Sequence, residues 1–244
     1  MLMMTTWLSS VFARQSMITG MQRTVAFDVY GTLIDPLGIS ETLSAFVGAI
    51  APAAAAAWRS KQLEYLFRRG LGRKYQPFSV CTRQALDYVC LARGLAIDEG
   101  DRDFLMRAYR ELPAYPGAGA VLQALRNADC RCYAFSNGGP GELRQLLANA
   151  GLNRSLDGIV SVEDVRSFKP DPAVYAHFLE NTGALLGRTW LVSGNPFDVI
   201  GALEVGWRAI WVRRDMQQVF DPWGITPTAT VSRLEELLGL LGAA

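Results

Sequence analysis

The chain of 244 residues is long enough for one large hydrophobic core, or for a core domain with a smaller domain beside it. Its formal charge of +1 predicts no nucleic-acid partner, and its single histidine, His177, excludes a metal site built from several histidines of one chain. The four cysteines match no standard zinc spacing, so we expect reduced thiols in or near the core.

The first 21 residues lack the basic start and the sustained apolar run of a signal peptide. We expect residues 1–21 to form a flexible N-terminal extension. No stretch of the chain reaches about 18 consecutive apolar residues, the length of a membrane span. These features predict a cytoplasmic protein without a membrane partner.

The chain then opens with a single short strand, followed by a long helical stretch. Thr24–Phe27 is a run of β-branched and aromatic residues, which predicts a buried strand that ends at Asp28. From about residue 38 to residue 112, β-branched runs are absent and helical spacings dominate. We expect three helices there, over Ala49–Arg69, Ser79–Ala92 and Glu99–Glu111.

Strands and helices alternate from about residue 115 onward. The expected helices are Ala118–Asn127, Gly141–Ala150, Pro172–Asn181, Val199–Val205 and Arg233–Leu241. The expected strands are Cys132–Phe135, Gly158–Val162, Thr189–Val192 and Ala209–Val212. This alternation predicts an α/β fold with a doubly wound parallel sheet, a Rossmann-like core formed by residues 22–35 and 115–244. Residues 36–114 are predicted to form a helical cap domain inserted into that core.

Polar residues follow the expected strands at the edge where ligands of such sheets bind. Asp28 follows the first strand, Ser136 and Asn137 follow the second, and Lys169 comes after a short excursion beyond the third. The fourth strand is followed by the run SGNPFD, residues 193–198. A sheet with a purely structural role would need few polar residues at these positions.

These residue types suit nucleophilic chemistry on an anionic substrate. A carboxylate directly after a buried strand can act as a nucleophile, and a nearby lysine favours its ionised form. Serine and asparagine before two glycines offer side-chain and backbone donors to a carboxylate or a phosphate. A second carboxylate, Asp198, is placed to hold the lysine or to position a water.

With these motifs in this order, the chain resembles the haloacid dehalogenase superfamily. The resemblance rests on Asp28 in DVYGTL, Ser136 in SNGG, Lys169 in FKPDPAVY and the run SGNPFD, and it covers roughly residues 22–240. Most members of that superfamily are magnesium-dependent phosphatases with a second aspartate where this chain has Tyr30. Tyr30 and the scarcity of acidic residues near Asp198 resemble instead the L-2-haloacid dehalogenases, which need no metal or other cofactor.

The expected cap carries a further part of the resemblance. Its text WRSKQLEY is similar to the segment of L-2-haloacid dehalogenases that supplies an arginine to the active site, which implies this role for Arg59. The same likeness implies an apolar pocket around C2 of the substrate, formed by Tyr30, Leu63, Phe78 and Phe197. The family usually has tryptophan in place of Phe197 and glutamine in place of Ser60, which leaves more room or fewer donors near the halogen.

The resemblance implies that short (S)-2-haloalkanoic acids are hydrolysed to (R)-2-hydroxyalkanoic acids and halide. The nucleophile would form an aspartyl ester by displacing halide, and water would then hydrolyse that ester. The expected catalytic residues are Asp28, Lys169, Arg59, Asp198, Asn195, Ser193 and Thr32. The expected substrate-binding residues are Ser136, Asn137, Tyr30, Leu63, Phe78, Phe197 and Tyr175. Tyr175 is expected to contact Asp28 or Lys169.

Two other functions stay open at this point. The same fold could carry a phosphatase or a phosphonate-type hydrolase, or it could serve as a non-catalytic binding module. The preferred halogen and chain length are not determined by the sequence, and fluoroacetate is a candidate substrate. A homodimer is also a candidate, since relatives are often dimers and the alanine-rich cap helix offers a surface for one.

Overall fold

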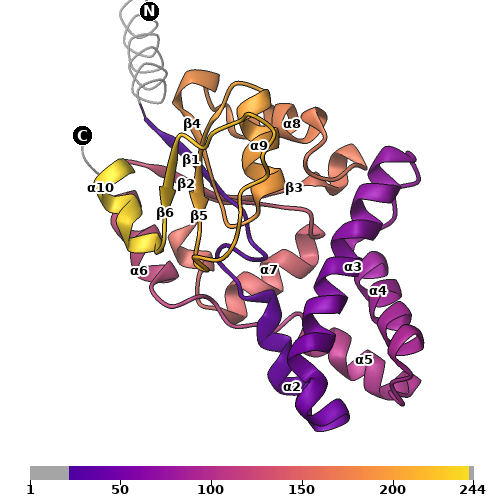
Figure 1. Cartoon of the computed structure of the whole chain (residues 1–244). Helices are drawn as coiled ribbons and strands as arrows, with labels where there is room; N and C mark the ends of the chain where they lie inside the picture. The colour runs from indigo at the N-terminus through magenta and orange to yellow at the C-terminus, as the bar shows by residue number, and fades with distance from the viewer. Residues whose placement is uncertain (1–21, 242–244) are drawn as a thin grey trace, which may run out of the picture.

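The core of the molecule is one parallel sheet of six strands in the order β3-β2-β1-β4-β5-β6. The computed structural model describes residues 22–241 (Figure 1). The strands are β1 (Thr24–Phe27), β2 (Arg131–Ser136), β3 (Gly158–Ser161), β4 (Thr189–Ser193), β5 (Arg208–Val212) and β6 (Ala229–Val231). Strand order reverses at β1, which lies between β2 and β4, so the ligand crevice of this sheet opens beyond the end of β1.

Helices flank this sheet on both sides. They are α6 (Ala118–Asn127), α7 (Pro140–Asn149), α8 (Pro172–Thr182), α9 (Pro196–Glu204) and α10 (Leu237–Leu241). Helix α6 packs against α10, and α8 packs against α9. Right-handed crossovers between parallel strands place these two sets on opposite faces. The predicted α/β class and doubly wound sheet are confirmed.

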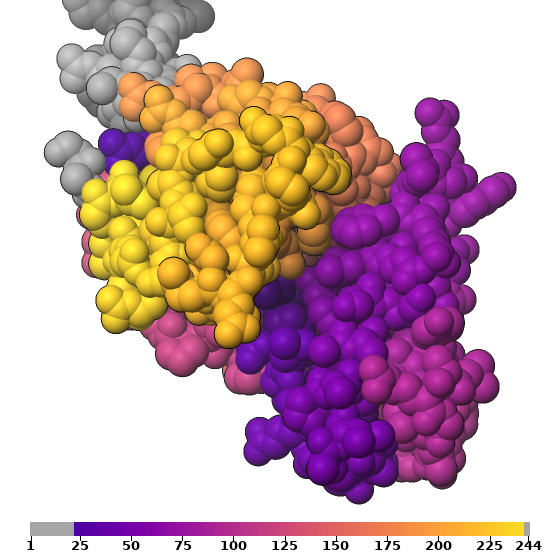
Figure 2. All heavy atoms as spheres, in the orientation of Figure 1, coloured from indigo at the N-terminus to yellow at the C-terminus, as the bar shows by residue number. Residues whose placement is uncertain are grey.

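The residues between β1 and α6 form a separate group of helices. They are α2 (Ile39–Val47), α3 (Ala51–Leu71), α4 (Phe78–Arg93) and α5 (Glu99–Ala108), and α3 packs between α2 and α4 beside the sheet (Figure 1). The Trp58 indole nitrogen donates to the carbonyl of Thr82 at 2.8 Å, which ties α3 to α4. The chain leaves the core at Ile34 and returns at Ala114, and these two residues form an isolated bridge. Figure 2 shows the helical group standing beside the core.

The structure departs from the sequence predictions in three places. Helix α2 and strand β6 were not predicted, because nine and three residues carry too little periodicity to stand out. The helix expected over Arg233–Leu241 is a 3-10 turn, Leu234–Glu236, followed by the short α10. The predicted flexible extension, residues 1–21, lies outside the described residues, and the predicted domain boundaries stay a prediction.

One stretch of the chain, Pro36–Leu71, is long and apolar enough to cross a membrane when only length and composition are considered. The sequence analysis counts consecutive apolar residues, and this count does not detect a segment whose mean hydropathy is high but whose apolar run is interrupted. In the fold this stretch is interrupted at Gly48, where φ is +59°, and it forms α2 and α3 rather than one straight helix. Trp58 and Leu66 of α3 are buried inside the protein. The absence of a membrane partner stays a prediction.

The four cysteines, Cys81, Cys90, Cys130 and Cys132, are free and buried, as predicted. Burial in apolar surroundings raises the pKa of each thiol above its ordinary value. Buried thiols of this kind are packing residues, which agrees with the absence of a zinc spacing in the sequence.

A pair of leucines tests where the core lies. Leu122 of α6 is fully buried, so Leu122→Ala should lower the free energy of unfolding by about 2–5 kcal/mol through lost burial and the cavity left behind. Leu91→Ala makes the same change on α4 at a side chain that is 81% exposed, and should cost less than about 0.5 kcal/mol. Urea unfolding monitored by circular dichroism measures both values, and equal losses would contradict this assignment of the core.

Candidate active site

A small cavity lies at the carboxyl edge of the sheet, where the loops after β1, β2 and β4 meet helix α3. Its volume is about 10 Å³, which is room for one water molecule. It is lined by Asp28, Tyr30, Arg59, Leu63, Phe78, Ser136, Asn137, Asn195 and Phe197. All nine are residues that the sequence analysis names, and they come from five separate stretches of the chain.

Asp28 lies at the base of this cavity and is surrounded by hydrogen-bond donors. Its Oδ2 accepts from Asn195 Nδ2 at 2.7 Å, from Thr32 Oγ1 at 2.8 Å and from Ser193 Oγ at 3.4 Å. Its Oδ1 receives one contact, from Lys169 Nζ at 3.3 Å. The carboxylate is therefore oriented by Oδ2, while Oδ1 is the less engaged oxygen.

The turn after β1 makes this arrangement possible. Gly31 has φ of +92°, in the left-handed region that side chains avoid, and the backbone then folds back so that Thr32 N donates to Val29 O. This brings Thr32 Oγ1 within reach of Asp28 while the same oxygen accepts from Gly194 N at 2.9 Å. One hydroxyl thus joins the loops after β1 and β4.

Lys169 is buried directly behind Asp28, with only 1% of the residue exposed. Its ammonium donates to Asp198 Oδ2 and to the carbonyl of Phe135, both at 2.8 Å, in addition to the contact with Asp28. The three N–H donors of the ammonium therefore have three acceptors, and the Phe135 ring lies 4.0 Å from Nζ. The sequence analysis missed Phe135, because its contribution is mainly a backbone carbonyl.

Asp198 is fully buried, and its carboxylate lies between Lys169 and Tyr175. Tyr175 Oη donates to Asp198 Oδ1 at 2.8 Å. Burial raises the pKa of Asp198 to about 6, against the opposing effect of the Lys169 charge and with a smaller contribution from Asp28. The placement of Tyr175 among the substrate-binding residues is corrected here. It does not line the cavity and contacts neither Asp28 nor Lys169, because Asp198 lies between them.

The loop after β2 is held rigidly at the side of the cavity. Asn137 Oδ1 accepts from the backbone N–H of Lys169 at 2.9 Å, so this asparagine offers its amide hydrogens to the cavity that it lines. Ser136 Oγ accepts from Gly138 N at 3.2 Å, and Ser161 Oγ donates to Gly138 O at 2.7 Å. Hydroxyl, amide and backbone donors gather here, as the sequence analysis expects for an anion site.

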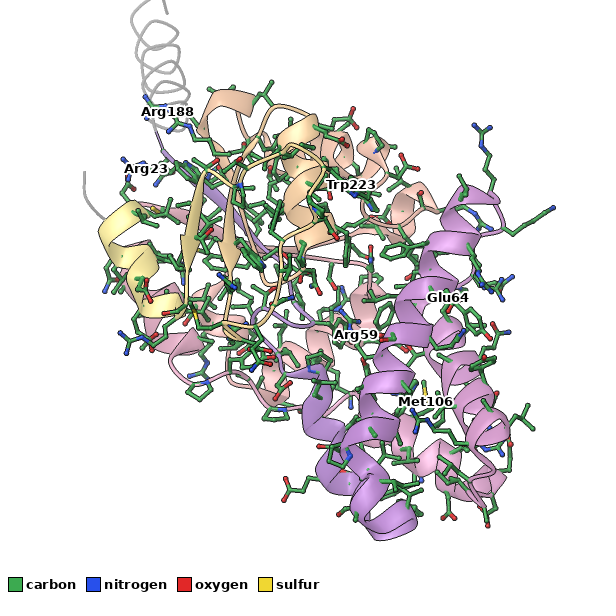
Figure 3. The ribbon with its side chains drawn as sticks, viewed as in Figure 1. Arg23, Arg59, Glu64, Met106, Arg188 and Trp223 are labelled. Carbon is green, nitrogen blue, oxygen red and sulfur yellow. The ribbon has the colours of Figure 1, made fainter. Side chains whose placement is uncertain are left out.

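Arg59 enters the cavity from α3, opposite the strand ends (Figure 3). Its Nη2 donates to the carbonyl of Tyr30 at 3.2 Å, and its Nη1 donates to Gln62 Oε1 at 2.6 Å. Gln62 is fully buried and is itself held by Thr82 Oγ1 at 2.5 Å and Tyr109 Oη at 3.2 Å. The sequence analysis missed Gln62. The available signal was a polar residue on the buried face of an amphipathic helix, three positions after Arg59.

The remaining wall of the cavity is apolar. Tyr30 stacks on Phe78 at 4.9 Å and on Tyr109 at 5.8 Å between ring centroids. Burial raises the pKa of the Tyr30 phenol well above its ordinary value, so this residue brings no negative charge to the site at neutral pH. Leu63 and Phe197 complete the wall. The residues expected around C2 of a substrate are therefore brought together.

The donor set around Asp28 does not suit a divalent cation. Within residues 22–241, no group of three or more His, Cys, Asp or Glu side chains is close enough to share a metal ion. Asp28 and Asp198 converge on the Lys169 ammonium, and Mg²⁺ would require hard oxygen ligands in that place.

Comparisons with known proteins show what the chain is similar to. The profile of the haloacid dehalogenase-like hydrolases matches residues 22–206. The (S)-2-haloacid dehalogenase H-109 of Pseudomonas putida is 34% identical over 213 residues, which cover 87% of this chain and 95% of that protein. The haloacetate dehalogenase H-2 of a Moraxella strain is 32% identical over 217 residues, covering 89% and 96%.

Solved structures show the same likeness. The L-2-haloacid dehalogenase from Xanthobacter autotrophicus, solved with chloropropionic acid covalently bound, superposes with a TM-score of 0.83 at 33% identity. The match covers 90% of this chain and 98% of that one. The likeness therefore includes both the sheet and the helical group beside it.

The raised pKa of Asp198 generates a prediction about pH. Below pH 6 this carboxylate takes up a proton, and Lys169 then loses a charged partner and draws closer to Asp28. We expect kcat/KM for halide release to fall about tenfold per pH unit below an apparent pKa near 6, a value that belongs to the coupled group. Asp198→Asn should remove this acidic limb. Asp164→Asn, at an exposed position, should keep it, and a limb unchanged in Asp198→Asn would contradict the assignment.

Proposed function

The chain belongs to the haloacid dehalogenase-like hydrolases, and on this premise we propose that it hydrolyses (S)-2-haloalkanoic acids to (R)-2-hydroxyalkanoic acids and halide. The observation that carries the proposal is the Asp28 carboxylate, held by donors on Oδ2 and facing Arg59 across a cavity with an apolar wall. The names of the relatives support the substrate class.

In the first step, Asp28 Oδ1 attacks C2 of the substrate from the side opposite the halogen. A C–O bond forms, the C–X bond breaks, and the halide leaves with the electron pair. Oδ1 is the attacking oxygen because it has a single contact at 3.3 Å, whereas Oδ2 has three donors. The configuration at C2 inverts once, in this step.

The cavity offers separate partners for the substrate carboxylate and for the halogen that leaves as halide. Arg59 and Asn137 stabilise the departing halide, where preorganised donors act on charge as it develops. Ser136 and the backbone N–H groups near it bind the carboxylate. Leu63, Phe78 and Phe197 surround the carbon atom between them.

In the second step, water attacks the carbonyl carbon of the aspartyl ester. The C–O bond of the tetrahedral intermediate breaks toward the hydroxy acid, the Asp28 carboxylate is restored, and the net reaction releases one proton. Oδ2 is the ester carbonyl oxygen, so the donors on it, Thr32, Asn195 and Ser193, stabilise the negative charge that it gains. Asp198 positions Lys169 throughout.

The alternatives receive less support. A phosphatase of this fold needs a general acid where this chain has the neutral Tyr30, and acidic metal ligands near Asp198 where this chain has Gly194 and Asn195. A non-catalytic binding module would not need three donors on one carboxylate. We therefore propose a metal-independent reaction, with fluoroacetate among the candidate substrates. A cytoplasmic location and a homodimer stay predictions.

The covalent step is tested by a single turnover in ¹⁸O-labelled water. Because water attacks the ester carbonyl of Asp28, the label should enter Asp28 and not the first molecule of hydroxy acid, as mass spectrometry of both would show. Asp28→Asn should release no halide from (S)-2-chloropropionate. Label that appears in the first product would contradict the ester intermediate.

The role of Arg59 is tested by Arg59→Lys, which removes the planar fork that contacts Tyr30 and Gln62. We expect kcat for halide release to fall by about 10²–10³, because one preorganised donor to the leaving group is lost. Arg68→Lys on the same helix, at a side chain 69% exposed, is the matched control and should leave kcat unchanged. Equal rates in the two variants would remove Arg59 from the mechanism.

Metal independence is tested by prolonged treatment with a chelator, followed by the same halide-release assay. The donor set around Asp28 predicts full activity after treatment. Activity that disappears and returns on addition of Mg²⁺, together with hydrolysis of a generic phosphate ester, would favour the phosphatase alternative. Bromo-, chloro- and fluoroacetate and both enantiomers of 2-chloropropionate in one panel define the halogen and the configuration.

A further inference from the structure

The catalytic cavity is too small for the substrate that it is proposed to bind. A volume of about 10 Å³ holds a water molecule, whereas a haloalkanoate has at least five heavy atoms. Some of the lining side chains must therefore move when a substrate enters. Phe197 differs from the other eight lining residues in one respect, because it also lines a second and much larger space.

This second space is an apolar cleft of about 680 Å³ between helix α3 and the core. Its apolar lining side chains are Leu66, Phe67, Leu71, Phe168, Phe197 and Trp223. Leu71 and Trp223 are 91% and 69% exposed, so large apolar side chains stand open to water at its mouth. In Figure 3, Trp223 lies on the side of the sheet, in the stretch between β5 and β6, and Arg59 lies on α3.

One face of α3 connects the cavity to the cleft. Arg59 and Leu63 line the cavity, Leu66 and Phe67 come next, and Gly70 lines the cleft one further turn along. Spacings of three and four residues place these positions in one stripe along the helix. Movement along this stripe therefore leads from the reacting carbon into the cleft.

Two aromatic rings separate the spaces. The Phe67 and Phe197 rings meet edge to face, with centroids 5.0 Å apart. Phe67 is 37% exposed and Phe197 is half-buried, so neither ring is enclosed on all sides. Both rings belong to side chains, so their rotation would need no change in the sheet.

We propose that this cleft is a subsite for the alkyl tail of longer 2-haloalkanoates, with Phe67 and Phe197 as its gate. The inference rests on the proposed function and adds a substrate class to it, because the carboxylate and halogen stay at Asp28 and Arg59 while carbon atoms from C4 onward enter the cleft. This departs from the short substrates expected from the sequence. The apolar side chains of the cleft offer burial to the CH₂ groups of the tail, and the charged residues Arg73, Lys169 and Asp171 line the same cleft.

Competitive inhibition by carboxylates without a halogen tests the subsite. Propionate, butyrate, hexanoate and octanoate should inhibit hydrolysis of (S)-2-chloropropionate with Ki values that fall about threefold to fourfold for each CH₂ that is buried. Trp223 fluorescence, isolated as the difference between the chain and Trp223→Phe, should change on binding of octanoate and not of propionate. This second readout needs no turnover, so it tests the cleft even if halide release is absent.

Gly70→Leu tests the location of the tail. A Cβ at Gly70 meets only Phe168, at 3.9 Å, so the leucine fills the cleft without a clash. In this variant the fall in Ki with increasing chain length should vanish, while kcat for 2-chloropropionate is retained. Gly239→Leu makes the same change on α10, where a Cβ would meet nothing within 4 Å. This variant should keep the fall in Ki with chain length.

Three outcomes would overturn the proposal. The first is a Ki series that does not change with chain length in the unmodified chain. The second is a series that stays equally steep in Gly70→Leu. The third is an assembly mass, measured by analytical ultracentrifugation, that changes in Gly70→Leu while the dependence of Ki on chain length does not. This result would assign the cleft to contact with a second copy of the chain. If no halide is released but Trp223 fluorescence still changes with octanoate and not with propionate, the proposed function is rejected and the subsite is retained.

Discussion

The buried ammonium of Lys169 is the constraint on which the rest of the site depends. A charge that is 1% exposed is tolerated only when it is paired and its hydrogen bonds are made, and three acceptors do this here. Those acceptors come from β2, from the end of β1 and from α9. The position of one nitrogen atom therefore holds three stretches of the chain at fixed distances, and Asp28 lies at the end of one of them.

Most of the fold could be predicted because its signals are local. Strands such as Thr24–Phe27 are short apolar runs bounded by polar residues. Helix α8 begins after Asp171 with Pro172 and ends at Gly183, which are standard start and stop signals. Strand β6 and helix α2 carry no such signal. Strand β6 has three residues at the sheet edge, and α2 has only Ile39 and Leu43 buried.

The candidate site could be predicted to the extent that side-chain chemistry marks it. Asp28, Lys169 and Asp198 follow strands of a parallel sheet, and the carboxyl ends of parallel strands lie at the same edge of the sheet. Gln62 and the Phe135 carbonyl could not be found in this way, because their roles depend on packing between elements distant in sequence. Tyr175 was assigned to the correct neighbourhood but to the wrong partner, since only coordinates show that Asp198 separates it from the cavity.

The bridge between Ile34 and Ala114 has a consequence for how such proteins diversify. The helical group is joined to the core by two segments that pass side by side, so it can be lengthened, replaced or lost with little cost in chain closure. The buried charges stay on the core side of this junction, whereas Arg59, Leu63 and Phe67 lie beyond it on α3. Changes in the helical group can therefore alter the side chains that it places opposite Asp28, while the contacts of Lys169 with Asp28 and Asp198 are preserved.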